Sequence, residues 1–301
     1  MAEAQVQQGA VASTEVESRS RREDFLRAFF SNRLAIFGTV VMSIFILMAV
    51  FAPLLAPYDP LDQNLPEKFD GPSLAHPFGQ DELGRDILSR VIYGARISLT
   101  AGLAAVVLAT AAGTLIGVVA GYFGSYTDSG LMRLMDVILA FPSILLAIII
   151  VSVLGPSLVN AMLAIGIVFV PQVARVVRSA VISVRERDYI EAERAIGAPN
   201  YQIIISGVLP NCMAPLIVQA TLTLATAILD IAALSFLGLG ARAPTPEWGA
   251  MLTDAFRSGF GVFVQGQHAI IFPGIAIALA VLSVNFVGDG LRDALDPRRR
   301  G

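Results

Sequence analysis

Few side chains in this sequence have a type and spacing that could do chemistry. A phosphate-binding P-loop needs Gly-Lys-Ser/Thr, and the only lysine, Lys68, lies between Glu67 and Phe69. The two histidines, His76 and His268, belong to no His-Glu-x-x-His metal motif. The single cysteine, Cys212, starts an apolar run with no histidine nearby, which indicates a packed small side chain. We therefore expect no catalytic residue, no metal site and no cofactor in this chain.

Four polar residues interrupt apolar runs, and these are the candidates for contact with a solute. An ionised carboxylate at the centre of a bilayer span costs about 2.5 to 3.5 kcal/mol on insertion scales, so Asp230 should face a cavity or a partner. Gln172, Gln219 and Asn285 can each hydrogen-bond a peptide backbone or a neighbouring helix. We interpret Asp230 first as part of a translocation pathway. For the three amides, we prefer hydrogen bonding between helices as the interpretation, ahead of a role in the same pathway.

A polar segment, residues 178–208, separates two of the apolar runs. Residues 189–196 are good helix formers with acidic residues near their start, Gly197 can take the left-handed position after a helix, and Pro199 prevents continuation. The pattern predicts a short helix lying across the membrane surface. Such a helix suits docking into a groove of another protein, and an ordinary interfacial helix explains the pattern equally well.

Membrane-spanning helices must position these residues. The chain has 301 residues, 55% hydrophobic and only 15% charged, with a mean hydropathy of +0.70, which fits badly with a water-facing surface. A disordered chain and a disulfide scaffold are excluded, and the net charge of −3 gives no reason to expect a nucleic-acid partner. Long apolar runs predict an all-α membrane protein with six transmembrane helices, at residues 34–56, 97–121, 131–154, 158–177, 209–237 and 269–291.

The arginines predict that both termini are cytoplasmic, because Lys and Arg near span ends resist translocation. In that orientation 15 of the 21 basic residues lie inside. The expected organisation has four parts. They are a disordered cytoplasmic tail (1–33), a first span with an outer loop ending in an amphipathic stretch (34–96), a membrane core with the cytoplasmic loop 178–208 (97–291), and a cytoplasmic C-terminus (292–301).

Small residues recur every four positions along the second run, where another helix backbone can approach closely. They are Ala101, Ala105, Ala109, Gly113, Gly117 and Gly121. Packing within the chain is the preferred interpretation, ahead of a seam between subunits. At the inner end of the third run, Arg133 and Asp136 are three residues apart and could pair on one helix face.

The polar loop resembles the EAA loop of ABC-importer permeases. That pattern is Glu-Ala-Ala, three residues, Gly, nine residues, Ile, one residue, Leu-Pro. Glu191, Ala192, Gly197, Leu209 and Pro210 keep its spacing. In that family the loop forms a coupling helix that seats in a cleft of the ATPase subunit. The resemblance therefore implies that Glu191, Ala192 and Gly197 lie at the ATPase contact, with Leu209 and Pro210 at the entry to the fifth span.

The sequence departs from that pattern at two positions. Glu193 stands in place of the second alanine, and Gly207 stands at the isoleucine position. The surface of the expected coupling helix therefore differs from the family's usual one, although the spacing is intact.

Three further segments narrow the resemblance to the C-type permease subunit of dipeptide, oligopeptide and nickel importers. Residues 76–96 are similar to the outer segment before span two, and residues 241–249 and 288–297 are similar to later segments. Together the matches run from about residue 30 to residue 297. The resemblance implies a six-helix fold like that of type I ABC-importer permeases.

The resemblance also implies partners and a location. This chain would be one permease subunit of a heterodimer, driven by two separate ATP-binding subunits and supplied by an external solute-binding protein. It would be a multi-pass protein of the bacterial cytoplasmic membrane, in contact with lipid. It would import dipeptides or related small solutes and would itself catalyse no chemical step.

The alternative is a secondary transporter driven by an ion gradient. Such a protein would want ion-coordinating carboxylates near the bilayer midplane and often an inverted repeat, and Asp230 is the one candidate carboxylate here. A membrane enzyme has less support, because the sequence offers no nucleophile paired with a base.

Overall fold

The structure, a computed structural model, describes residues 21–259 and 265–295. Within that part of the chain all regular structure is helical, apart from one isolated β-bridge between Gln80 and Asp86. This confirms the predicted all-α class. The helices are α2 (Arg21–Ser31), α3 (Arg33–Val50), α4 (Ala52–Leu55), η1 (Leu65–Glu67), α5 (Ile87–Phe123), α6 (Ser125–Leu139), α7 (Ser143–Leu154), α8 (Leu158–Arg185), α9 (Asp188–Ala195), α10 (Asn200–Gln202), the π-helix η2 (Ile203–Val208), α11 (Leu209–Phe236), α12 (Trp248–Arg257) and α14 (His268–Leu295).

Five helices in the described residues are long and apolar enough to cross a membrane, and the bent pair α6–α7 makes a sixth crossing if it counts as one span. The five are α3, α5, α8, the run α10–η2–α11, and α14. With 37 residues, α5 is about 55 Å long, so it extends beyond a hydrocarbon core of about 30 Å. The stretch 86–96, expected in the outer loop, instead forms the N-cap and first turns of α5.

The third predicted span, residues 131–154, is not one continuous helix. α6 and α7 meet at an angle of 88°. Pro142 lies between them and disfavours helical geometry at Phe141, so α6 ends just before it. Asp136 does not pair with Arg133 as expected. Its carboxylate accepts a hydrogen bond from Arg175 of α8 at 2.5 Å, because the break lets α6 lie alongside α8.

The N-terminal segment 1–33, expected to be a disordered tail, contains helix α2, and residues 1–20 lie outside the described residues. Phe29 of α2 is buried with Ala294 of α14 and Ala35 of α3 in one apolar cluster. This apolar contact places α2 against the bundle, which the polar composition around it does not predict.

The core of the bundle is the close pairing of α5 with α8. A Cβ atom at Gly113 would lie 2.6 Å from the Cβ of Val173, and one at Gly117 would lie 2.6 Å from the carbonyl oxygen of Ala174. Gly121 would place a Cβ 2.9 Å from Val181 in the same way. The strip of small residues therefore packs within the chain, as expected, because only glycine lets these two backbones approach so closely.

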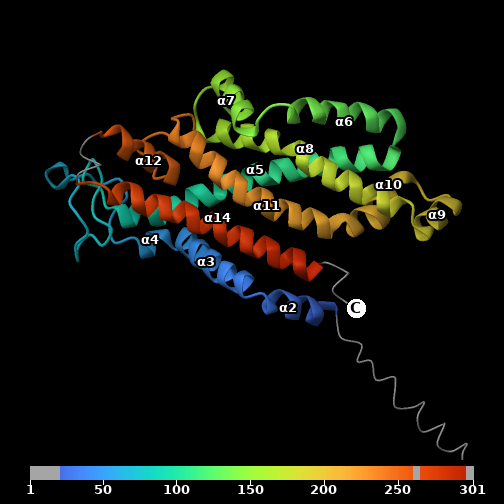
Figure 1. Cartoon of the computed structure of the whole chain (residues 1–301), viewed down its shortest axis with the longest axis horizontal. Coiled ribbons are helices and arrows are strands. Elements are labelled where there is room, and N and C mark those ends of the chain that lie inside the picture. The colour runs from blue at the N-terminus through green and yellow to red at the C-terminus, as the bar shows by residue number, and fades with distance from the viewer. Residues whose placement is uncertain (1–20, 260–264, 296–301) are drawn as a thin grey trace, which may run out of the picture.

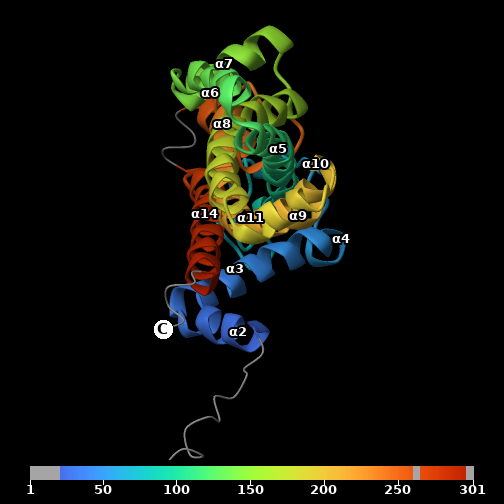
Figure 2. The ribbon, with the colours of Figure 1, turned by 90° about the vertical axis from the view of Figure 1, so that its right-hand side faces the viewer.

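The bundle has two ends that carry different elements (Figure 1). One end, called here the α9 end, carries α9 and α10 beside the end of α5, with α2 on the same side of the bundle (Figure 2). The other end, called here the α12 end, carries α12, α4 and the loop before α5. The loop predicted on the cytoplasmic side of the membrane and the loop predicted on the outer side thus lie at opposite ends of the bundle.

Candidate functional site

The α9 end holds the residues carried by the resemblance, beginning with the helix stop at Gly197. This residue has φ +80°, the left-handed conformation predicted for it. Its N–H donates to the carbonyl of Arg194 at 3.0 Å, and the N–H of Ala198 donates to the carbonyl of Glu193 at 3.1 Å. These two bonds form a Schellman motif, which satisfies the last carbonyls of α9. No atom lies within 4 Å of a Cβ built on Gly197, so backbone conformation alone requires glycine.

The outward surface of α9 and the turn after it form a candidate docking surface. We call it the α9 surface, and we define it by five of the exposed residues there: Glu191, Ala192, Ala195, Ile196 and Tyr201. Ile196 is 83% exposed and Tyr201 is 69% exposed, so two large side chains are accessible at the α9 end of the bundle. The resemblance identified Glu191 and Ala192 but missed Ile196 and Tyr201, although their large side chains flank the glycine turn in the sequence.

The inward face of α9 explains the two departures from the family pattern. Ile190 is fully buried against η2, and a Cβ on Gly207 would lie 2.7 Å from Ile190 Cδ1 and 3.2 Å from Glu193 Oε2. A side chain at position 207 would therefore require the tips of both Ile190 and Glu193 to shift. Glu193, larger than alanine, fits because Gly207 leaves room for it, so the two changes compensate for one another.

Leu209 and Pro210 lie where η2 joins α11, as the entry position implies. Pro210 has no N–H, and its ring disturbs an α-helical contact with the residue four positions earlier. The six-residue π-helix directly before α11 provides the wider turn that accommodates this. The carbonyl of Gly207 in this turn accepts hydrogen bonds from Asn211 Nδ2 at 2.7 Å and from the Tyr189 hydroxyl at 3.3 Å.

The four candidate pathway residues do not form one cluster. Gln219 lines a groove of about 610 Å³ between α8, α11 and α14, and its Nε2 donates to Thr223 Oγ1 at 3.2 Å. Gln172 is exposed on α8, one turn before Val176 of the same groove, and Asn285 is half-buried on α14. Asp230 is half-buried eleven residues beyond Gln219, about 16 Å further along α11. Its buried Oδ2 has no hydrogen-bond partner among the described residues.

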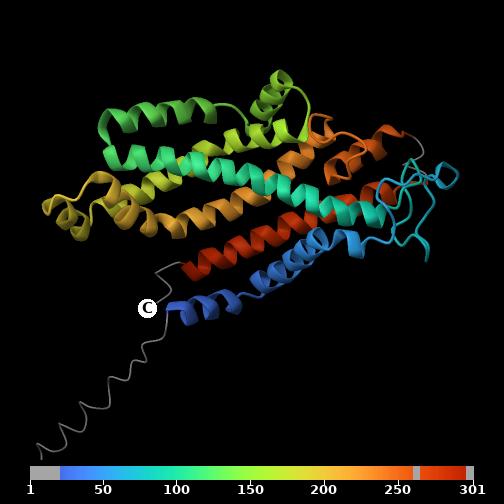
Figure 3. The same ribbon diagram turned by 180° about the vertical axis from the view of Figure 1, so that it is seen from behind.

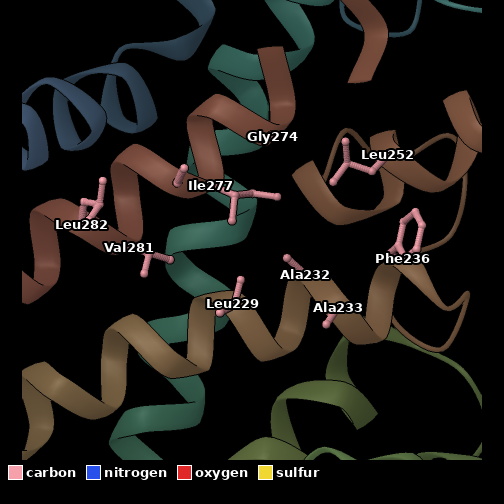
Figure 4. Close-up of a pocket in the computed structure, with 10 residues that line it drawn as sticks. Leu229, Ala232, Ala233, Phe236, Leu252, Gly274, Ile277, Val281 and Leu282 are labelled. Atoms are coloured by element: carbon pink, nitrogen blue, oxygen red, sulfur yellow. The ribbon is translucent and has the colours of Figure 1, made fainter. Parts of the chain in front are cut away.

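A second groove, apolar and about 460 Å³ in volume, opens near the α12 end between α11, α12 and α14 (Figure 4). Leu229 and Ala232 of α11 face Ile277 and Val281 of α14 across it, and Phe236 lies toward Leu252 of α12, as Figure 4 shows. Asp230 follows Leu229 directly but does not line this groove.

The α12 end contains a buried ionic cluster that sequence reasoning missed. Arg85 Nε donates to Asp81 Oδ2 at 2.7 Å, and a second guanidinium nitrogen bonds Glu82. Arg90 Nε lies 3.3 Å from the same Asp81 oxygen, and Asp254 of α12 lies 3.7 to 3.8 Å from both arginines. Burial and the neighbouring Asp81 raise the pKa of Glu82 to about 7. The cluster joins the loop before α5, α5 itself and α12 through charges that are largely removed from water.

A tryptophan joint fixes α12 to α5 beside this cluster. Trp248 is fully buried, and its Nε1 donates to the carbonyl of Val91 at 3.0 Å. The carboxylate of Glu247 accepts from the backbone N–H of Gly249 at 3.0 Å and of Ala250 at 2.8 Å, which caps α12, and from Ser98 Oγ at 3.2 Å. Burial raises the pKa of Glu247. The segment 241–249, singled out only by resemblance, therefore attaches α12 firmly to α5.

Comparison with known proteins identifies two families along the chain. Residues 113–301 match the family described as binding-protein-dependent transport system inner membrane component. Residues 20–77 match the N-terminal TM domain of oligopeptide transport permease C.

Three relatives align over most of the chain. A dipeptide transport system permease of Alkalihalophilus pseudofirmus is 52% identical over 89% of this chain and 87% of its own length. A di/tripeptide permease of Pseudomonas aeruginosa is 46% identical over 92% of each chain. A glutathione transport system permease of Escherichia coli O157:H7 is 44% identical over 94% of this chain and 92% of its own length.

A solved structure has the same fold. An inward-facing conformation of the methionine ABC transporter MetNI superposes with a TM-score of 0.56 at 20% sequence identity. The superposition covers 70% of this chain and 98% of that chain. Over that share of the chain, the fold is that of a type I ABC importer permease.

Proposed function

This chain belongs to the family of binding-protein-dependent transport system inner membrane components, and we propose that it carries dipeptides or related small solutes. It is a multi-pass permease of an ABC importer in the bacterial inner membrane. The names of the relatives support the substrate class: dipeptides, di/tripeptides and the tripeptide-like glutathione all contain amide bonds and terminal charges.

The α9 surface is proposed as the contact for one ATP-binding subunit. A second, separate ATP-binding subunit would dock in the same way on the other permease of the pair. The observation that carries this is the exposed Ile196, 83% accessible, held at the tip of a helix that the left-handed Gly197 ends. An apolar side chain presented by a rigid turn suits a groove in another protein. In this arrangement the α9 end faces the cytoplasm, and both termini lie on that side.

The remaining partners follow from the same assignment. A second permease subunit would complete a heterodimeric pore, and an external solute-binding protein would deliver substrate at the α12 end. Lipid would cover the apolar faces of the spans. Closure of the ATP-binding subunits would displace α9 and rock the bundle between inward-open and outward-open states. Hydrolysis would then occur on the partner chains.

The pathway is proposed to pass Gln219 and Asp230, with Gln172 and Asn285 as further candidates. Support comes from the groove beside Gln219 and from the orphaned Asp230 carboxylate oxygen, because a buried acid without a partner is expensive in a membrane unless it serves a function. Replacing Asp230 with leucine should alter substrate handling more than assembly. Loss of folded protein without a change in selectivity would make Asp230 structural instead.

Reconstitution in proteoliposomes tests the proposed function. The chain, its second permease and the ATP-binding subunits should take up a labelled dipeptide only when ATP and the binding protein are present. Omitting the ATP-binding subunits should abolish uptake. Uptake by this chain alone, driven by a proton or sodium gradient, would refute the proposal and favour an ion-coupled transporter.

A further inference from the structure

The side chain of Tyr122, one residue before the end of α5, lies between α9 and α10. Its hydroxyl donates to Asn200 Oδ1 at 2.9 Å, and the guanidinium of Arg194 lies over its ring, 5.4 Å from the centroid. Arg194 belongs to the last turn of α9, and Asn200 begins α10. Tyr122, itself only 7% exposed, therefore contacts the chain on both sides of the glycine turn.

The end of α5 is also tied to the end of α8. Arg185 Nη1 donates to the carbonyl of Gly121 at 2.8 Å and to that of Tyr122 at 3.4 Å. Gly124, at φ +65°, leaves the space for this guanidinium, because a Cβ there would lie 3.0 Å from Arg185 Nη1. A polar cavity of about 450 Å³ is lined by Tyr122 and Arg185 together with Glu191. The contacts of Tyr122 with Arg194 and Asn200 therefore link the end of α5 to α9 and α10.

α5 is suited to carry a displacement along its length. Among the described helices of 28 residues or more, it alone has no internal proline, whereas α8, α11 and α14 contain Pro171, Pro215 and Pro273. Sharp kinks in helices form mainly at prolines, so α5 lacks the kink site that each of the other three long helices contains. Figure 3 shows it running from the α9 end to the α12 end of the bundle.

The far end of α5 is fixed to α12. Val91 accepts the Trp248 indole N–H at 3.0 Å, and Ser98 donates to Glu247 at 3.2 Å. Arg90 lies 3.8 Å from Asp254 of α12. A shift of α5 along or about its axis must therefore move α12 or break these buried contacts.

We propose that Tyr122 is the positioning residue that transmits displacement of α9 to α5, and through α5 to α12 at the opposite end. This inference rests on the proposed function, because an ATP-driven partner is what displaces α9. Tyr122 touches no substrate in this role. It converts docking at the α9 surface into movement at the other end of the bundle.

The test uses the complete transporter in proteoliposomes, with an environment-sensitive fluorophore on Ala243→Cys. Ala243 is exposed next to α12, and the native Cys212 is buried. Tyr122→Leu should lower the ATP-dependent fluorescence change at least fivefold while assembly and the rate of ATP hydrolysis stay within twofold of wild type. The matched control, Tyr126→Leu, changes a tyrosine at the same end that is 93% exposed, and should leave the signal unchanged.

Two milder variants keep the proposal testable if Tyr122→Leu fails to assemble. Tyr122→Phe and Asn200→Ala each remove the same hydrogen bond, so each should lower the signal at least twofold, and the double variant should lower it no further. Signals equal to wild type in Tyr122→Leu, or in both milder variants, overturn the inference while the proposed function stands. A wild-type complex with no response to ATP refutes the proposed function and this inference together.

Discussion

Substitution of Gly197 by valine isolates the conformational requirement of the helix stop. At φ +80° a non-glycine residue is strained by about 1 to 3 kcal/mol, with β-branched residues at the upper end. Because no atom lies within 4 Å of the added Cβ, no steric clash contributes. A strain of that size lowers the equilibrium constant for the correctly ended α9 by about 5-fold to 150-fold. We expect ATP-dependent uptake to decrease by a factor in that range while membrane insertion persists.

Uptake per ATP hydrolysed, measured in proteoliposomes, is the assay, and two matched variants sharpen it. Gly197→Asn should retain most uptake, since asparagine tolerates the left-handed region. Gly130→Val adds the same side chain at an exposed glycine of α6 that also has no atom within 4 Å but an ordinary φ, so it should resemble wild type. The reasoning is refuted if Gly197→Val transports normally, or if Gly197→Asn is as defective as Gly197→Val.

Three other outcomes are expected. Trp248→Ala should destabilise the folded protein by about 3 to 5 kcal/mol, seen as a lower thermal unfolding midpoint by circular dichroism in detergent, because a fully buried indole is lost; an unchanged midpoint would contradict the joint between α5 and α12. Glu82 has a pKa of about 7 in the folded protein against 4.5 ordinarily, so the folded state holds its proton longer and stability should fall as pH rises from about 4.5 to about 7. Glu82→Gln should remove this pH dependence of the free energy of unfolding. The same pH dependence in the variant and in wild type would contradict the raised pKa of Glu82. Ala198→Cys should react with an impermeant maleimide in inside-out vesicles only, and reaction in intact cells would place the α9 end outside.

The sequence predicts the number of apolar crossings well because hydrophobicity over about 20 residues is a local property. It does not predict the break in the third crossing. Residues 131–154 remain apolar through Pro142, and hydropathy does not register the backbone restriction that this proline imposes at Phe141. The extra turns of α5 were missed for a related reason. Arg90 interrupts the apolar pattern, so the predicted span begins after it. The acidic side chains that surround Arg90 are brought close to it only by the fold.

The candidate site also has one feature that the sequence predicts and others that it does not. The left-handed Gly197 was predictable, since a helix stop is encoded within a few residues. The contact between Glu193 and Gly207 was not, because each residue alone looks like a departure from a pattern. Asp254 lies 169 residues from Arg85, and no spacing rule joins such distant charges. Contacts of that kind depend on the packing of the whole bundle.

Photo-cross-linking from Ile196 tests most directly whether a separate ATPase drives this chain through α9. A photoreactive amino acid placed at Ile196, which is 83% exposed, should form an adduct with an ATP-binding subunit in the assembled complex. The same probe at the fully exposed Leu74, in the loop of the α12 end, should form none with that subunit. An adduct from Leu74 and none from Ile196 would contradict the account.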